Sequence, residues 1–105
     1  MPRRRVLLVD DDTDFRTVMQ EVLDTSGYVP AGAVDGTEGL AQAERLPPDV
    51  ILLDIRMPGL NGYEVCRRLK QNPATAAIPV IFLTGVQDLT LERLAYEAGA
   101  VACIT

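Results

Sequence analysis

Short apolar runs alternate along this chain with longer segments in which apolar residues recur at helical spacing. The runs that define strands lie at residues 6–9, 49–53 and 80–83, and such runs are typical of strands buried on both faces of a sheet. Weaker versions of the same pattern predict strands at residues 28–34 and 101–104. The pattern therefore predicts five strands.

Four helices are predicted between these strands. The first starts in the Asp- and Thr-rich segment after residue 9 and stops at Gly27, the second stops before Pro47, and the fourth stops before Gly99. The second, third and fourth helices span residues 38–46, 63–71 and 89–98. The apolar positions at helical spacing are Phe15, Val18, Met19, Val22 and Leu23 in the first helix, Leu40, Ala43 and Leu46 in the second, and Val65 and Leu69 in the third.

This alternation of strands and helices is typical of an α/β sandwich with a parallel central sheet. Five strands favour the doubly wound, flavodoxin-like order 2-1-3-4-5, whose topological switch point lies between the first and third strands. In such a sheet a ligand binds beside the carboxyl ends of the strands at the switch point. The residues that follow positions 9 and 53 are therefore the ones that indicate function.

Composition narrows the class of protein. A length of 105 residues fits one domain, which we expect to cover residues 1–105. A net charge of −5 disfavours direct binding of nucleic acid, because that function requires a basic surface. No segment approaches the ~20 apolar residues of a membrane span, so we expect no membrane insertion and a cytoplasmic location. The chain has no histidine, which excludes a histidine-based catalytic triad.

The two cysteines fit a reducing compartment. Cys66 and Cys103 stand far apart and form no C-x-x-C pair. We interpret both as reduced packing residues and not as a disulfide, a metal site or a nucleophile.

Acidic residues gather at the predicted switch point. The first strand ends in Asp10, Asp11 and Asp12, and the third strand ends in Asp54. Adjacent strands lie about 4.8 Å apart, so these carboxylates should converge. Crowded like charges favour capture of a divalent cation, and all-oxygen ligands suit Mg²⁺. Asp12 and Asp14 also suit the start of the first helix, whereas Asp54 has no immediate helix to cap.

Thr84 and Gly85 follow the fourth strand, next to the third. A hydroxyl at residue 84 can donate to an oxygen bound at Asp54, and Gly85 leaves space beside it. A single threonine at a strand end also agrees with ordinary β-propensity. The carboxylate cluster favours the functional interpretation.

Three segments of the chain, residues 6–12, 50–62 and 80–85, together resemble the receiver domain of two-component response regulators. The resemblance implies that Asp54 is the phosphoacceptor and that Asp10 and Asp11 hold Mg²⁺ with it. It also implies that the backbone carbonyl of Arg56 is a metal ligand and that Thr84 binds the phosphoryl group. The implied donor is a sensor histidine kinase or a phosphotransfer protein. Phosphorylation would pull Thr84 toward the site and resettle residues 85–88.

Two features depart from the resemblance. The family places a lysine after the fifth strand, and this chain stops at Thr105 before that position, so we expect its last helix to be missing. The family often places an aromatic residue where Cys103 stands. In the usual switch that aromatic residue couples with the threonine, and Cys103 cannot supply an aromatic side chain. With the last helix missing, apolar strand residues would be exposed, so we expect self-association through that open face.

Two other classes of protein share parts of this acidic pattern. Haloacid-dehalogenase-type hydrolases also use aspartates after a first strand, but Asp14 stands where they need Thr or Val, and the chain is too short for their remaining motifs. A calcium-binding loop from Asp10 to Glu21 would need glycine where Phe15 stands. Steady hydrolysis of a phosphate ester would favour the hydrolase, and one phosphate held per chain would favour the receiver domain.

Overall fold

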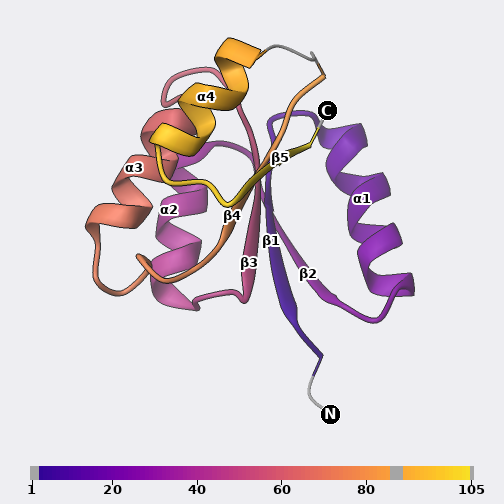
Figure 1. The fold of residues 1–105 in the computed structure, drawn as a ribbon. Coiled ribbons are helices and arrows are strands. Elements are labelled where there is room, and N and C mark those ends of the chain that lie inside the picture. The colour runs from indigo at the N-terminus through magenta and orange to yellow at the C-terminus, as the bar shows by residue number, and fades with distance from the viewer. Residues whose placement is uncertain (1–2, 86–88, 105) are drawn as a thin grey trace.

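The computed structural model describes residues 3–85 and 89–104, and its central feature is a parallel sheet (Figure 1). The strands are β1 (Arg5–Val9), β2 (Val29–Ala33), β3 (Val50–Asp54), β4 (Val80–Leu83) and β5 (Ala102–Ile104). They lie in the order β2-β1-β3-β4-β5, and each neighbouring pair is parallel. The predicted doubly wound order is confirmed, with its switch point between β1 and β3.

Helices connect the strands, and three of them begin at a polar side chain. The helices are α1 (Thr13–Thr25), α2 (Gly36–Arg45), α3 (Gly62–Gln71) and α4 (Leu89–Glu97). Asp12, Asp35 and Asn61 each accept a hydrogen bond from a backbone N–H in the first turn of α1, α2 and α3, which satisfies a donor that the helix cannot pair. None of the described helices is both long and apolar enough to cross a membrane.

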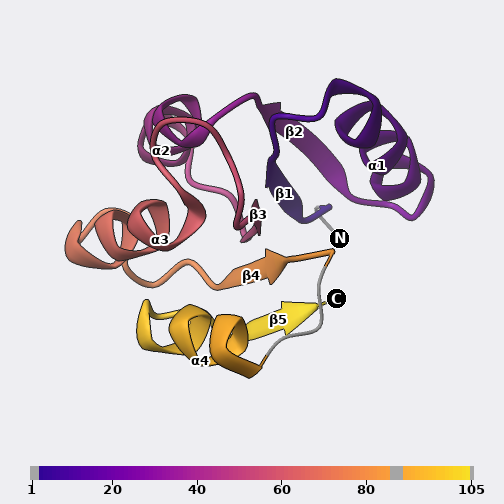
Figure 2. The ribbon, with the colours of Figure 1, turned by 90° about the horizontal axis from the view of Figure 1, so that it is seen from above.

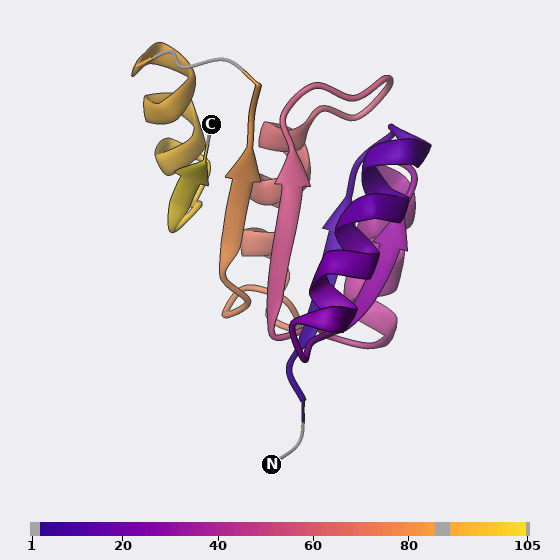
Figure 3. The ribbon, with the colours of Figure 1, turned by 90° about the vertical axis from the view of Figure 1, so that its right-hand side faces the viewer.

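The helices cover the two faces of the sheet unequally. Seen from above, α2, α3 and α4 lie on one side of the sheet and α1 lies alone on the other (Figure 2). In the side view α1 lies over β1 and β2, while no described helix stands in front of β3, β4 and β5 (Figure 3). Right-handed crossovers between parallel strands produce this division of sides.

The core lies between the sheet and the three helices α2, α3 and α4 that cover one of its faces. Val65, Cys66 and Leu69 of α3 are buried there, together with Phe82 of β4, whose ring lies 5.5 Å from that of Tyr63 between centroids. The inward positions predicted at Val65 and Leu69 are confirmed, as is Ala43 in α2.

The inward position predicted at Leu46 is wrong. Its side chain is 58% exposed, and the residue lies past the end of α2 in a non-helical conformation with φ −144° and ψ 85°. Leu46 precedes Pro47, and a residue before proline is sterically driven out of the helical region. The helix therefore ends at Arg45, and the apolar spacing extends one residue too far.

The apolar stripe of α1 is largely exposed. No residue of α1 is buried, and Phe15, Val18 and Val22 are 38%, 57% and 50% exposed. Ile104 of β5 is exposed as well. The spacing predicted the helix correctly, but the described residues leave most of its apolar side without a covering layer.

Gly62, the first residue of α3, lies against the end of β3. A Cβ atom at this position would clash with the carbonyl oxygen of Asp54 and would lie 2.9 Å from both the Cα of Ile55 and Cε1 of Phe82. The absence of a side chain thus lets α3 begin directly beside the strand that carries Asp54.

Basic side chains bind backbone oxygens at the amino end of the sheet. The ammonium group of Lys70 donates to the carbonyls of Ala76 and Ile78, at 3.1 and 2.6 Å, in the loop before β4. Arg5 donates to the carbonyls of Leu46 and Pro47 after α2.

Two further contacts complete this end of the sheet. The backbone N–H of Arg5 donates to the Asp49 carboxylate at 2.7 Å. The buried hydroxyl of Thr75 donates to the Leu69 carbonyl at 2.7 Å. The amino end is thus built from paired polar groups.

The free edge of β2 is modified at two successive outward positions. Val29 uses its N–H toward β1, since it donates to the Arg4 carbonyl, so the nitrogen of Pro30 points away from the sheet and carries no hydrogen. The next outward residue is Gly32, and its carbonyl accepts a hydrogen bond from the Gln42 side chain at 2.9 Å.

Candidate functional site

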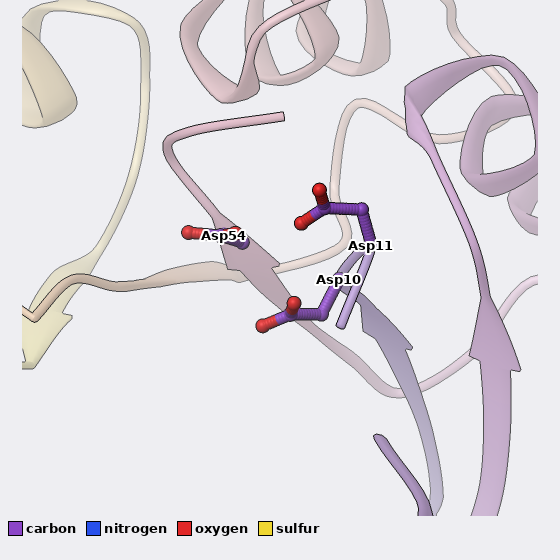
Figure 4. Close-up of side chains that lie close together, drawn as sticks. All are labelled: Asp10, Asp11 and Asp54. Carbon is purple, nitrogen blue, oxygen red and sulfur yellow. The ribbon is translucent and has the colours of Figure 1, made fainter. Parts of the chain in front are cut away.

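Three aspartates meet at the carboxyl ends of the two central strands. Asp10 and Asp11 follow β1, and Asp54 is the last residue of β3, which pairs directly with β1. The close-up shows their side chains extending toward one shared space (Figure 4). One carboxylate oxygen from each lies within 4.8 Å of the others. The convergence predicted from the sequence is therefore present for Asp10, Asp11 and Asp54, whereas Asp12 is not part of the cluster.

Local hydrogen bonds hold the turn after β1. The Asp10 carboxylate accepts from the backbone N–H of Asp12 at 2.9 Å, and the Asp12 carboxylate in turn accepts from the N–H of Phe15 at 3.1 Å. Asp12 is thus the N-cap of α1 and Asp14 lies in its first turn, as predicted. Residues 13–21 are helical, so the calcium-loop alternative has no loop.

Burial and mutual repulsion raise the pKa of two of these carboxyls. For Asp54 the pKa rises from the ordinary value of 3.8 to about 6, mainly because the group is removed from water and next because of the negative charge of Asp10. Burial also raises the pKa of Asp10, opposed by the hydrogen bond from Asp12 and reinforced by the charge of Asp11. Each charge makes its neighbours harder to ionise, so the cluster favours a positive partner.

The aspartates line an open cavity of about 510 Å³. Phe15 and Met19 of α1 form one side, and Leu83, Thr84 and Ile104 form the other. The Thr84 N–H donates to the Ile104 carbonyl at 2.9 Å, which anchors the end of β4 to β5. The structure therefore brings Asp10, Asp11, Asp54 and Thr84 into one cavity.

Arg56 lies on a different side of the site. Its backbone N–H donates to the Asp54 carboxylate at 3.2 Å, and the residue lines a separate groove with Met57, Tyr63 and Leu91. The backbone N–H of Arg56 thus holds the Asp54 carboxylate from the turn after β3. A metal-binding role for the Arg56 carbonyl stays a prediction.

Cys103 is half-buried beside β4, where it pairs in register with Phe82. Burial raises the pKa of its thiol, and so does the nearby charge of Glu92. Cys66 is fully buried, and burial raises the pKa of that thiol as well. Both cysteines are free, in agreement with their interpretation as reduced packing residues.

One residue at the site was not found from the sequence. Arg16 of α1 donates to the backbone carbonyl of Asp10 at 2.6 Å, directly behind the acidic cluster. The available signal was its position, as the single basic residue of a helix that follows three aspartates.

The comparisons with known proteins identify a family for this chain. The family model described as "Response regulator receiver domain" matches residues 6–105. The transcriptional regulator RpaA of Synechocystis sp. is 38% identical over 96 residues, covering 91% of this chain and 40% of that protein. The response regulator PleD of Caulobacter vibrioides is 39% identical over 101 residues, covering 96% of this chain and 22% of that protein.

A solved structure shares the fold over nearly the whole chain. The Vibrio cholerae chemotaxis protein CheY4 superposes with a TM-score of 0.94 at 28% identity, covering 99% of this chain and 87% of that one. Among the curated relatives, this chain spans 40% of the length of RpaA and 22% of that of PleD. In that family an aspartate accepts a phosphoryl group and the domain acts as a signalling switch. The chain belongs to the receiver domain family of two-component response regulators.

Proposed function

We propose that Asp54 accepts a phosphoryl group and that Asp10 and Asp11 hold Mg²⁺ beside it. The observation that carries this proposal is the convergence of three carboxylates, with one oxygen of each within 4.8 Å of the others, around the half-buried acceptor Asp54. A set of hard oxygen donors suits Mg²⁺, and the raised pKa values of Asp10 and Asp54 indicate a cluster that a cation would stabilise. The Arg56 carbonyl is the proposed fourth protein ligand.

In the proposed reaction a carboxylate oxygen of Asp54 attacks the phosphorus of a phosphohistidine. The phosphorus–nitrogen bond breaks, its electron pair stays on the imidazole, and Asp54 becomes an acyl phosphate. With a pKa of about 6, Asp54 is mostly ionised at neutral pH and thus able to attack. Bound Mg²⁺ supplies positive charge that offsets the carboxylates and the phosphoryl oxygens. Self-catalysed hydrolysis of the acyl phosphate later restores the carboxylate.

Thr84 is the proposed contact for the bound phosphoryl group, because it lines the same cavity from the neighbouring strand. Movement of Thr84 toward that group would act on β5 through the backbone bond to Ile104. Residues 86–88, which we expect to respond next, lie outside the described residues. The half-buried Cys103 takes the place at which the family often has an aromatic residue.

The proposed donor is a sensor histidine kinase or a phosphotransfer protein, acting in the cytoplasm. Membership of the receiver family supports this partner. RpaA and several other relatives are described as DNA-binding, and this chain covers only their receiver portion, so we propose that residues 1–105 form a receiver domain that makes no direct contact with nucleic acid.

Phosphate incorporation from acetyl phosphate and Mg²⁺ tests the proposal. We expect Asp54→Asn to abolish stable incorporation and Asp49→Asn, which changes an aspartate at the opposite end of the sheet, to retain it. The amount bound should reach one phosphate per chain and then stop. Unchanged incorporation in Asp54→Asn would place the acceptor elsewhere, and continuous turnover of p-nitrophenyl phosphate would favour a hydrolase.

We also propose that the chain of 105 residues self-associates through its open apolar face. Support comes from the exposed side chains of Phe15, Val18 and Val22 on α1 and of Ile104 on β5, since large apolar patches usually mark an interface. Sedimentation velocity at rising concentration tests this, with Val18→Glu as the variant expected to shift the chain toward monomer. A wild-type chain that stays monomeric at high concentration would refute self-association.

A further inference from the structure

Arg16 connects the second turn of α1 to the end of β1. Its backbone N–H donates to the Asp12 carbonyl as part of the helix, while its half-buried side chain reaches back along the turn. One guanidinium nitrogen donates to the Asp10 carbonyl at 2.6 Å, and another lies 3.4 Å from the Thr13 hydroxyl. The side chain of Arg16 therefore links the two ends of the segment formed by residues 10–16.

The acceptor of this short bond has a special place in the chain. The carbonyl of Asp10 belongs to the peptide group that joins Asp10 to Asp11, and a peptide group is planar. Fixing the direction of that carbonyl fixes the plane between the two aspartates. On its other side Asp10 is held by its own N–H, which donates to the Ala33 carbonyl of β2 at 3.1 Å.

We infer that Arg16 is a positioning residue that orients the peptide between Asp10 and Asp11 so that both carboxylates face Asp54. This inference rests on the proposed function, because it assigns Arg16 to the cation site of that proposal. Arg16 acts through the backbone of Asp10 and contributes no ligand. Its bonds go to neutral oxygens, a carbonyl and a hydroxyl, which leaves the carboxylates available.

The charge of Arg16 and its hydrogen bond have opposite effects on cation binding. A guanidinium near the cluster repels Mg²⁺, so removal of its charge alone would tighten binding. Loss of the bond to the Asp10 carbonyl would free the peptide plane and weaken binding. The sign of the change therefore separates a positioning role from a purely electrostatic one.

Calorimetric titration of the protein with Mg²⁺ provides the test. We expect Arg16→Met, which keeps an unbranched apolar stem but removes the donors and the charge, to weaken Mg²⁺ binding about tenfold, as is typical when a residue that orients a metal ligand is lost. Arg16→Lys, which keeps one donor, should recover part of the affinity. Arg93→Met serves as the matched control, since Arg93 is an exposed residue of α4 paired with Glu97.

Phosphorylation by acetyl phosphate gives a second readout. Arg16→Met should raise the Mg²⁺ concentration needed for half-maximal incorporation and leave the rate at saturating Mg²⁺ nearly unchanged. Should Arg16→Met not fold by circular dichroism, Arg16→Ala replaces it, because alanine favours the helix and its side chain carries neither a donor nor a charge.

The outcomes separate this inference from the proposed function. A folded Arg16→Met or Arg16→Ala variant that binds Mg²⁺ as tightly as the wild type, or more tightly, would overturn the positioning role alone. A wild-type chain that binds no Mg²⁺ and incorporates no phosphate would overturn both proposals. Weaker binding in the Arg16 variant, with Arg93→Met unchanged, would support the inference.

Discussion

The charged residues at the two ends of the sheet have opposite kinds of neighbours. At the amino end, Lys70 binds two backbone carbonyls, and Asp49 accepts from the N–H of Arg5. At the carboxyl end, Asp10, Asp11 and Asp54 face one another with oxygens within 4.8 Å. Hydrogen-bonded charged groups thus lie at one end of the sheet and mutually repelling charges at the other.

This difference separates what stabilises the fold from what gives it chemistry. Charges paired with backbone groups contribute to the free energy of unfolding, whereas like charges held together lower it until a cation or a proton arrives. We therefore expect a substitution that removes a charge to change the stability in one direction at the amino end and in the other at the carboxyl end.

The largest effect on stability is expected at Lys70. Replacement by methionine in Lys70→Met would leave the carbonyls of Ala76 and Ile78 without their charged donor, and a hydrogen bond to a charged group contributes about 1.5–3 kcal/mol. We expect the free energy of unfolding to fall by about 2 kcal/mol in urea titrations without metal.

Arg68→Met is the matched control for this prediction. Arg68 also lies on α3, but its side chain is 54% exposed and pairs with Glu64 on the surface. Surface ion pairs contribute little, so a change below about 0.5 kcal/mol is expected. Equal losses of the free energy of unfolding in the two variants would show that the hydrogen bonds of Lys70 stabilise the fold no more than a surface ion pair does.

The dependence of stability on pH should reveal the opposite behaviour of Asp54. Its pKa in the folded state is about 6 against an ordinary value of 3.8, so the folded chain holds a proton that the unfolded chain has lost. This contribution to stability is fully present below the ordinary pKa and is lost as the pH rises through about 6. Because Asp54 is partly exposed to solvent, the effect of its ionisation on stability is reduced. Ionisation of Asp54 should lower the free energy of unfolding by about 1 kcal/mol between pH 5 and pH 7 without metal.

Urea denaturation of the wild type and of Asp54→Asn at both pH values measures this share. The amide cannot ionise, so the difference in stability between the two chains should grow with pH. If the two chains instead respond to pH identically, Asp54 does not titrate in this range, and the charge crowding described for the carboxyl end is overstated.

The smallest effect is a pair of changes of opposite sign. Asp11→Asn should leave the metal-free fold as stable as the wild type or about 0.5 kcal/mol more stable, because it relieves repulsion with Asp10 and Asp54. Asp49→Asn should lower stability by about 0.5 kcal/mol, because its bond to the Arg5 N–H loses the assistance of charge. Chemical denaturation without metal compares the two variants.

Titration with Mg²⁺ completes that comparison. Asp11→Asn should bind Mg²⁺ more weakly, and Asp49→Asn should bind it normally. A loss of metal-free stability in Asp11→Asn together with unchanged affinity for Mg²⁺ would contradict the view that Asp11 belongs to a cation site.

Much of the fold and of the site was predictable from the sequence because buried parallel strands leave a strong local pattern. The run at residues 80–83 predicted β4 with its observed bounds, and the order of the strands followed from their alternation with helices. Asp10, Asp54 and Thr84 were selected because each comes directly after a buried apolar run, and Asp11 because it follows Asp10.

The features that the sequence did not predict depend on how the folded chain brings residues together, which the local pattern does not describe. The apolar spacing of α1 predicted a helix but could not tell which layer covers it, and Val18 proved exposed. The error at Leu46 arose because helical spacing was followed past the point where Pro47 disfavours the helix. Arg16 was missed because its bond to the Asp10 carbonyl depends on how the turn after β1 folds back.

The free edge of β2 bears on how this chain can meet other β-sheets. An exposed edge strand usually offers a row of donors and acceptors on which a foreign strand can add, and such addition starts many fibrillar aggregates. Here Pro30 has no hydrogen to donate, and the Gly32 carbonyl is already bound by Gln42. A peptide that added next to β2 would find neither this donor nor this acceptor available, so edge-to-edge pairing of sheets, or capture of an extended peptide as an added strand, is disfavoured at this edge.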